Sequence, residues 1–207
     1  MTTRYISRTY IDLWTSVEIH VRLESETKDK DARLAARLSA LVFAFFSLEA
    51  YLNHLGIKMR PDLWEGEKER EYFSGRNKID GHRYYGPIGK LQFLYLKCGL
   101  IYDETSDEMQ TIRKLKQFRD ILAHGKTEEA ALPVSCAPDE MPYLIVPEVW
   151  QYVQSDLREA AYAHVRIVVE RLHKAALAAF PDIGLEPAAF VSSFFQVTDM
   201  TKEKARC

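Results

Sequence analysis

The stretch DARLAARLSALVFAFFSLEAYLNHLGIK, residues 31–58, decides the fold class. Its apolar residues recur at alternating steps of four and three, the spacing of one helix face: Leu34, Leu38, Leu41, Phe45, Leu48, Leu52 and Leu55. Asp31 stands where an N-cap would begin this helix. Val42, Phe43 and Phe46 widen the apolar face, so we expect a central helix that contacts several others or a second subunit.

The rest of the chain also favours helices. We expect them at 5–23, 65–72, 88–100, 105–123 and 147–180, with a loop or small hairpin at 130–147 that includes a short strand at 143–146. Thr105 or Ser106 can cap one helix, and Gly99 and Gly125 suit two helix ends. The prediction is an all-α, antiparallel helical bundle with one irregular or hairpin insertion before the long final helix. Residues 1–180 form one helical domain with an extra N-terminal helix, and 181–207 form a tail that either docks or frays.

The composition indicates where the protein is located more than what it does. The 207 residues carry a net charge of -2, so any contact with nucleic acid must come from a local patch. The three cysteines, Cys98, Cys136 and Cys207, have no C-x-x-C spacing, which favours reduced thiols in a cytoplasmic protein. No signal-peptide pattern and no apolar run of about 18 residues is found, so we expect no membrane association.

One segment contains candidate catalytic residues, FRDILAHG at residues 118–125. On a helical projection Arg119 falls in the apolar sector of its helix, where an unpaired guanidinium would be costly, so it needs a carboxylate partner or an anionic ligand. His124 lies about 140° further round, and the two side chains converge only if the last turn unwinds, as Gly125 allows. The C-terminal end of the helix dipole favours an imidazolium, and a histidine titrates near neutral pH.

Arg119-Asp120-x-x-x-His124-Gly125 resembles the signature motif of the HEPN superfamily. Glu49-Ala50-Tyr51-Leu52-Asn53 also looks like a segment of that family's early helix, in which an acidic residue often recurs. The resemblance implies a helical bundle that dimerises so that two motifs face each other. Many members are metal-independent endoribonucleases of toxin and antiviral systems. The implied partners are a second copy, RNA and, in a toxin pair, an antitoxin protein.

The resemblance also implies roles. His124 would move protons, Arg119 would bind the phosphate, and Asp120 would orient one of them, in an attack of the RNA 2′-hydroxyl on the adjacent phosphate. Glu49, Asn53 and Lys126 are candidate substrate-binding residues. No metal or cofactor is expected, in keeping with the absence of residues at metal-ligand spacing.

Plainer interpretations stand beside these. Arg119 and His124 could form a structural ion pair or a helix C-cap, in a non-catalytic module that binds a nucleotide or protein, or in a purely structural dimer. Glu49 and Asn53 fit a structural network, in which Arg119 or a tyrosine pairs with Glu49. Basic and aromatic residues at 68–90 could form a groove for single-stranded RNA, but six acidic residues at 62–80 favour a solvated loop.

Overall fold

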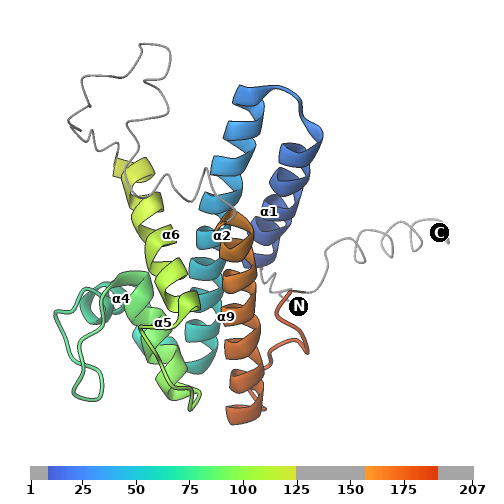
Figure 1. The fold of residues 1–207 in the computed structure, drawn as a ribbon. Coiled ribbons are helices and arrows are strands. Elements are labelled where there is room, and N and C mark those ends of the chain that lie inside the picture. Colours follow the sequence, from blue (N-terminus) through green and yellow to red (C-terminus); the bar gives the residue numbers. More distant parts are fainter. Residues whose placement is uncertain (1–8, 125–156, 191–207) are drawn as a thin grey trace, which may run out of the picture.

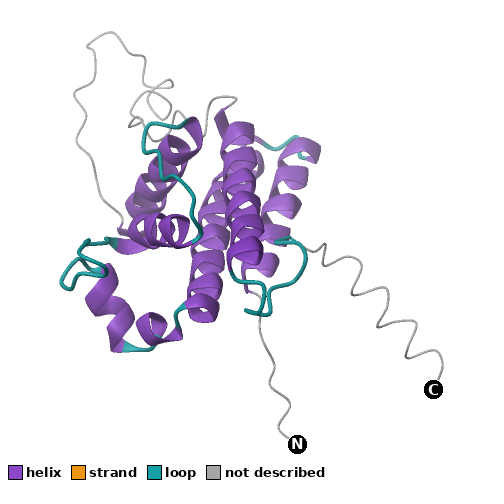
Figure 2. Ribbon diagram, turned by 90° about the horizontal axis from the view of Figure 1, so that it is seen from below, coloured by secondary structure: helices purple, strands orange, loops and turns teal. Residues whose placement is uncertain are grey.

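The computed structural model describes residues 9–124 and 157–190, and in these ranges the chain consists of helices and loops, without a named strand (Figure 2). Helices α1 (Thr9–Glu26) and α2 (Lys30–Met59) form an antiparallel hairpin, and α9 (Leu157–Ala179) packs beside α2 (Figure 1). Helix α6 (Asp107–His124) contacts both α2 and α9. The all-α class is confirmed. The insertion predicted at 130–147 and the helix start predicted at Pro147 lie outside the described residues.

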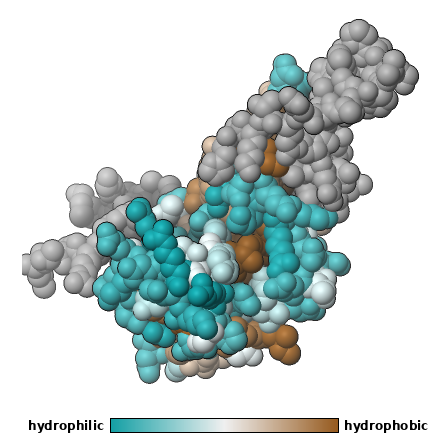
Figure 3. Space-filling model, turned by 90° about the vertical axis from the view of Figure 1, so that its left-hand side faces the viewer, coloured by the Kyte–Doolittle hydropathy of each residue, from teal (hydrophilic) through white to brown (hydrophobic). Residues whose placement is uncertain are grey.

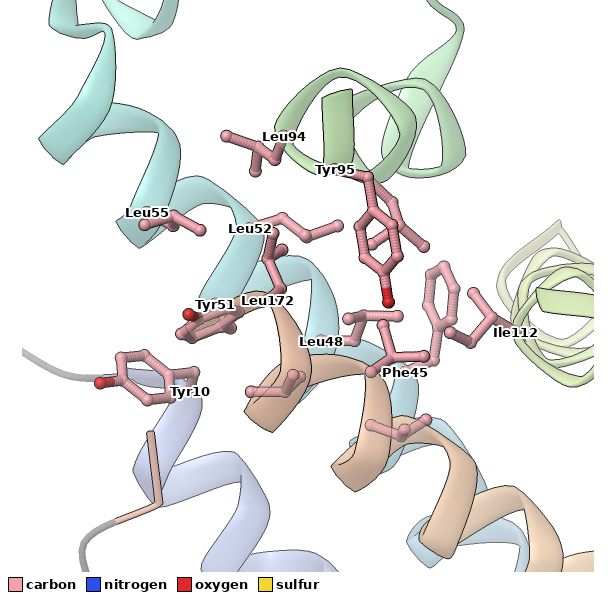
Figure 4. Packing of buried hydrophobic residues seen from close by; sticks show 14 of the residues in the cluster. Tyr10, Phe45, Leu48, Tyr51, Leu52, Leu55, Leu94, Tyr95, Ile112 and Leu172 are labelled. Carbon is pink, nitrogen blue, oxygen red and sulfur yellow. The ribbon is translucent and has the colours of Figure 1, made fainter. Parts of the chain in front are cut away.

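Helix α2 is central because its apolar stripe is buried along most of its length. Five members of the predicted stripe are at most 1% exposed: Leu41, Phe45, Leu48, Leu52 and Leu55. They belong to one hydrophobic cluster with residues of α1, α5 (Gly86–Lys97), α6 and α9 (Figure 4). Among the described helices, α2 alone is long and apolar enough to cross a membrane, a test that the core helix of a folded domain also passes.

The start of α2 differs from the sequence prediction. Asp29, not Asp31, is the N-cap, and its carboxylate accepts a hydrogen bond from the Ala32 amide at 2.8 Å. Asp31 lies instead in the first turn, where a negative charge interacts favourably with the helix dipole. The prediction of Asp31 was wrong by two residues because both aspartates suit a helix start and the periodicity does not separate them.

Two short helices follow α2 where the sequence predicts one at 65–72. Helix α3 (Pro61–Trp64) begins at a proline, which the first turn of a helix tolerates, and α4 (Glu67–Phe73) follows it. The Trp64 ring lies directly over Gly56 of α2, where an added Cβ would be 2.1 Å from the ring. This close approach joins α3 to the central helix.

The end of α5 is a glycine-terminated helix, as predicted. Gly99 has φ +72°, and its amide donates to the Leu96 carbonyl at 3.1 Å while the Leu100 amide donates to Tyr95 at 2.9 Å. This is the pattern of a Schellman motif.

The described part of the C-terminal segment, 181–190, docks on the bundle. The ring of Phe190 stacks on Trp14 of α1 with centroids 4.7 Å apart, and the Glu186 carbonyl accepts a hydrogen bond from Nε2 of His173 at 2.8 Å. Of the two outcomes predicted for the tail, docking therefore holds over 181–190. Residues 191–207 lie outside the described chain.

Candidate functional site

Helix α6 presents the predicted motif at its C-terminal end. Ser106 Oγ accepts a hydrogen bond from the Met109 amide at 3.4 Å, so Ser106 is the cap of the two that the sequence allowed. Of the residues that form the predicted apolar sector of this helix, Ile112, Leu115 and Phe118 are buried, whereas Leu122 is 43% exposed. Helix α6 is described as far as His124, and Gly125, which was predicted to stop it, lies outside the described residues.

Arg119 is oriented toward α2 and has the partner that its position requires. Its Nη2 lies 3.3 Å from Oε2 of Glu49, and its Nη1 lies 2.9 Å from Oδ1 of Asp120. The guanidinium carbon is 5.1 Å from the centre of the Phe45 ring, within the range of a cation–π contact. Of the two partners that the sequence allowed for Glu49, arginine or tyrosine, the structure has the arginine.

One nitrogen of Arg119 is still unused. Its Nε is buried, and no described residue accepts its hydrogen. The side chain as a whole is 20% exposed. A guanidinium donates in a planar fork that matches phosphate and carboxylate oxygens, so this group can bind an anion if a carboxylate yields part of its contact.

Asp120 is shared between two cations. Its Oδ2 accepts from Nζ of Lys116 at 2.5 Å, one turn earlier on α6, while its Oδ1 faces Arg119. With Glu49 included, two carboxylates and two cations meet here, and their formal charges cancel. The sequence reasoning did not single out Lys116, although the i, i+4 spacing from Lys116 to Asp120 is a recognisable helical pair.

Asn53 is not brought to Arg119. Although it lies one helical turn from Glu49, its Oδ1 accepts from Nζ of Lys90 at 2.7 Å and from the Trp64 indole at 3.4 Å. Lys90, 6% exposed, also pairs with Glu69 of α4. Asn53 therefore connects the central helix to α4 and α5. The sequence favoured one structural network for Glu49 and Asn53, whereas the structure gives them different partners, Arg119 for Glu49 and the buried Lys90 for Asn53.

The remaining predicted residues fall at or beyond the limit of the described chain. The backbone of His124 is the last position of α6, and its side chain lies outside the described residues, as do Gly125 and Lys126. Within 9–124 and 157–190, no three His, Cys, Asp or Glu residues gather as metal ligands would. A pocket of about 460 Å³ lies at the turn between α1 and α2, and none of the predicted site residues lines it.

Two other histidines have hydrogen-bond partners, His164 on a partly buried side chain and His173 in the core. His164 Nδ1 lies 2.8 Å from the Thr111 hydroxyl. His173 donates through Nε2 to a carbonyl, so a neutral His173 accepts at Nδ1 from Tyr51, 3.0 Å away. Burial raises the pKa of Tyr51, which keeps its hydroxyl protonated and able to donate.

Comparison with known proteins adds no further assignment to this geometry. No protein-family model matches the sequence, and neither the curated proteins nor the solved structures give a match.

Proposed function

We propose that this protein is a metal-independent endoribonuclease of HEPN type, a homodimer that cuts RNA in a toxin–antitoxin or antiviral defence role in the cytoplasm. The observation that carries the proposal is the setting of Arg119. Its guanidinium is held between Glu49 and Asp120 on a side chain that is 20% exposed, and His124, the last described residue of α6, follows five residues later. A phosphate-binding cation next to a proton-transfer group is what RNA cleavage by internal attack needs.

In this reaction the RNA 2′-hydroxyl attacks the neighbouring phosphorus and the bond to the 5′-oxygen breaks, which leaves a 2′,3′-cyclic phosphate and a 5′-hydroxyl. His124 takes the proton from the 2′-hydroxyl or returns one to the leaving oxygen. Arg119 stabilises the charge that develops on the phosphate oxygens. Asp120, paired with Lys116, fixes the orientation of the guanidinium.

The dimer is part of the proposal because the reaction needs both a base and an acid. A second copy with its motif facing the first would supply the second imidazole. Residues near the exposed end of α6, such as Leu122 at 43% exposure, are available for that contact.

The test is cleavage of a 5′-labelled single-stranded RNA in the presence of EDTA. We expect wild type to cut it and to leave cyclic phosphate ends, and His124→Ala and Arg119→Ala to be slower by about 10²–10⁴-fold. Matched controls are His20→Ala on α1 and Arg166→Ala, whose side chain is 57% exposed on α9. Absence of cleavage by wild type, or equal rates for wild type and His124→Ala, would rule out the enzyme.

One observation favours a second function, a non-catalytic module that binds a nucleotide or a protein. Arg119 has two carboxylate partners within its own chain, which is the arrangement of a structural ion pair. This alternative predicts that wild type binds a nucleotide or protein partner, that Arg119→Ala weakens the binding, and that no RNA is cleaved.

A further inference from the structure

The loop between α4 and α5, residues 74–85, has a defined shape despite its many charges. We call it the basic loop. Isolated antiparallel bridges pair Ser74 with Tyr85 and Ile79 with His82. Ile79 is 5% exposed and belongs to the hydrophobic core of the protein. The loop is therefore attached to the core at both its base and its middle, and it presents its polar side chains from a fixed backbone.

The basic loop itself carries more positive than negative charge, since five of the six acidic residues at 62–80 precede it. The loop contains Arg76, Lys78 and Arg83 and one acidic residue, Asp80. Asp80 is paired at 2.5 Å with Lys97 of α5, outside the loop, and this contact lowers the pKa of the carboxyl. The acidic residue of the loop is thus paired with a cation from outside it. One carboxylate of α4 also contacts the loop, since Asn77 Nδ2 donates to Oε2 of Glu71 at 3.4 Å, so three cations face one neighbouring carboxylate.

Two of these cations are open to a ligand. Arg76 and Lys78 are exposed, and neither has an ion-pair partner in the described part of the chain. Arg83 donates through Nη1 to the Gly75 carbonyl at 3.0 Å, which fixes its side chain across the base of the loop. Three cations on one ordered loop form a local positive patch in a protein whose net charge is negative.

An aromatic ring lies beside this patch. Tyr85 is 60% exposed, and its ring covers Gly75 so closely that an added Cβ there would be 2.0 Å from it. The ring is thus supported on one side while most of the side chain faces solvent. An exposed, supported aromatic ring next to cations is the combination on which the bases of a single strand stack.

The basic loop follows α4, which is anchored near the Arg119 site. Lys90 pairs with Glu69 of α4 and with Asn53 of α2, and Asn53 is one turn, about 6 Å, along α2 from Glu49. In Figure 1, α4, its loop and α6 lie on the same side of the bundle. Figure 3 looks onto that side, where hydrophilic residues cover much of the described surface.

We propose that the basic loop is a docking surface for single-stranded RNA, with Arg76, Lys78 and Arg83 on backbone phosphates and Tyr85 stacked on a base. The proposal rests on the proposed function for the identity of the substrate. It adds where the strand lies beyond the Arg119 site.

The experiment measures binding of a fluorescein-labelled, 12-nucleotide single-stranded RNA by anisotropy, with His124→Ala present throughout to prevent turnover. The test variant adds Arg76→Gln and Lys78→Gln. The matched control adds Lys28→Gln and Arg33→Gln, two exposed cations at the α1–α2 turn without an ion-pair partner among the described residues. Both variants lose two positive charges, so the control removes the effect of net charge.

Loss of two phosphate contacts should reduce the slope of the logarithm of the RNA association constant against the logarithm of the salt concentration by about 1.4. Because 0.1 M lies one decade below 1 M salt, this change corresponds to an affinity about 25-fold lower at 0.1 M. The control should change affinity less than threefold. Equal affinity of the two variants for the RNA would overturn the proposal. Binding to phosphatidylserine vesicles is measured in parallel, and a loss of vesicle binding without a loss of RNA binding would also overturn it. If wild type never cuts RNA but the loop variant binds it more weakly, the docking surface stands and the nuclease does not.

Discussion

Replacing Glu49 with glutamine tests whether the contact between Glu49 and Arg119 mainly stabilises the fold or leaves Arg119 able to bind an anion. At 3.3 Å and an effective dielectric constant near 20, the gross attraction between the two charges is about 5 kcal/mol. Desolvation and side-chain ordering offset most of it, since the two side chains are 20% and 29% exposed. Asp120 also stays with Arg119 in the variant. We therefore expect a loss of about 1 kcal/mol in the free energy of unfolding.

Urea denaturation followed by circular dichroism measures this loss, and in a thermal scan it corresponds to a Tm lower by about 2–4 °C for a chain of this size. Glu170→Gln is the matched control, because it breaks a solvent-exposed pair on α9 and should cost about 0.5 kcal/mol or less. With Glu49 neutral, inorganic phosphate should raise the Tm of the variant more than that of wild type. A loss of about 3 kcal/mol or more, the value for a broken buried pair, would make Arg119 a structural brace and refute the reasoning.

Three further predictions concern the supporting structure. Asn53→Leu should lower the free energy of unfolding in urea by about 2 kcal/mol, because the buried Lys90 ammonium loses an acceptor. The double variant with Lys90→Met should recover much of that loss, whereas strictly additive effects of the two substitutions would contradict the contact. A hydrogen bond from its own backbone amide, and then the contact with Arg171, lower the pKa of Glu108 below its ordinary 4.5. The ionised carboxylate therefore stabilises the folded state above about pH 4.5, and this contribution is lost as the pH falls through the lowered pKa. Glu108→Gln should therefore show a flatter acid-denaturation curve, and an unchanged curve would argue against the effect. Burial raises the pKa of Cys98 to about 11, so mass spectrometry should find this thiol unmodified by iodoacetamide at pH 8 in the native protein and modified in urea, whereas rapid native labelling would show an open core.

The sequence predicted best where one periodic signal was strong and uninterrupted. The Leu41 to Leu55 stripe identified the central helix because burying so many apolar side chains in register leaves one orientation for it. It predicted the start of that helix less well, because Asp29 and Asp31 offer similar capping chemistry. Chain breakers were also ambiguous, since Pro61 both ends α2 and begins α3.

In the candidate site, the sequence indicated the need for a partner but did not identify every partner. The position of Arg119 in an apolar sector required a carboxylate or an anionic ligand, and Glu49 supplies a carboxylate from 70 positions away in the chain. Asn53 shows the converse case. Its spacing from Glu49 suggested a shared role, but the tertiary packing of α4 and α5 gives it Lys90 as a partner. Contacts between distant segments depend on packing that local periodicity does not encode.

The stacking of Phe190 on Trp14 has a consequence for synthesis of the protein. The two rings are separated by roughly 180 residues, so at 5–20 residues per second the first waits roughly 10–35 s for the second. During that interval the face of the Trp14 indole that Phe190 later covers is without this partner. A chaperone that binds aromatic surface would have its longest opportunity there, and a slow codon late in the message would extend it.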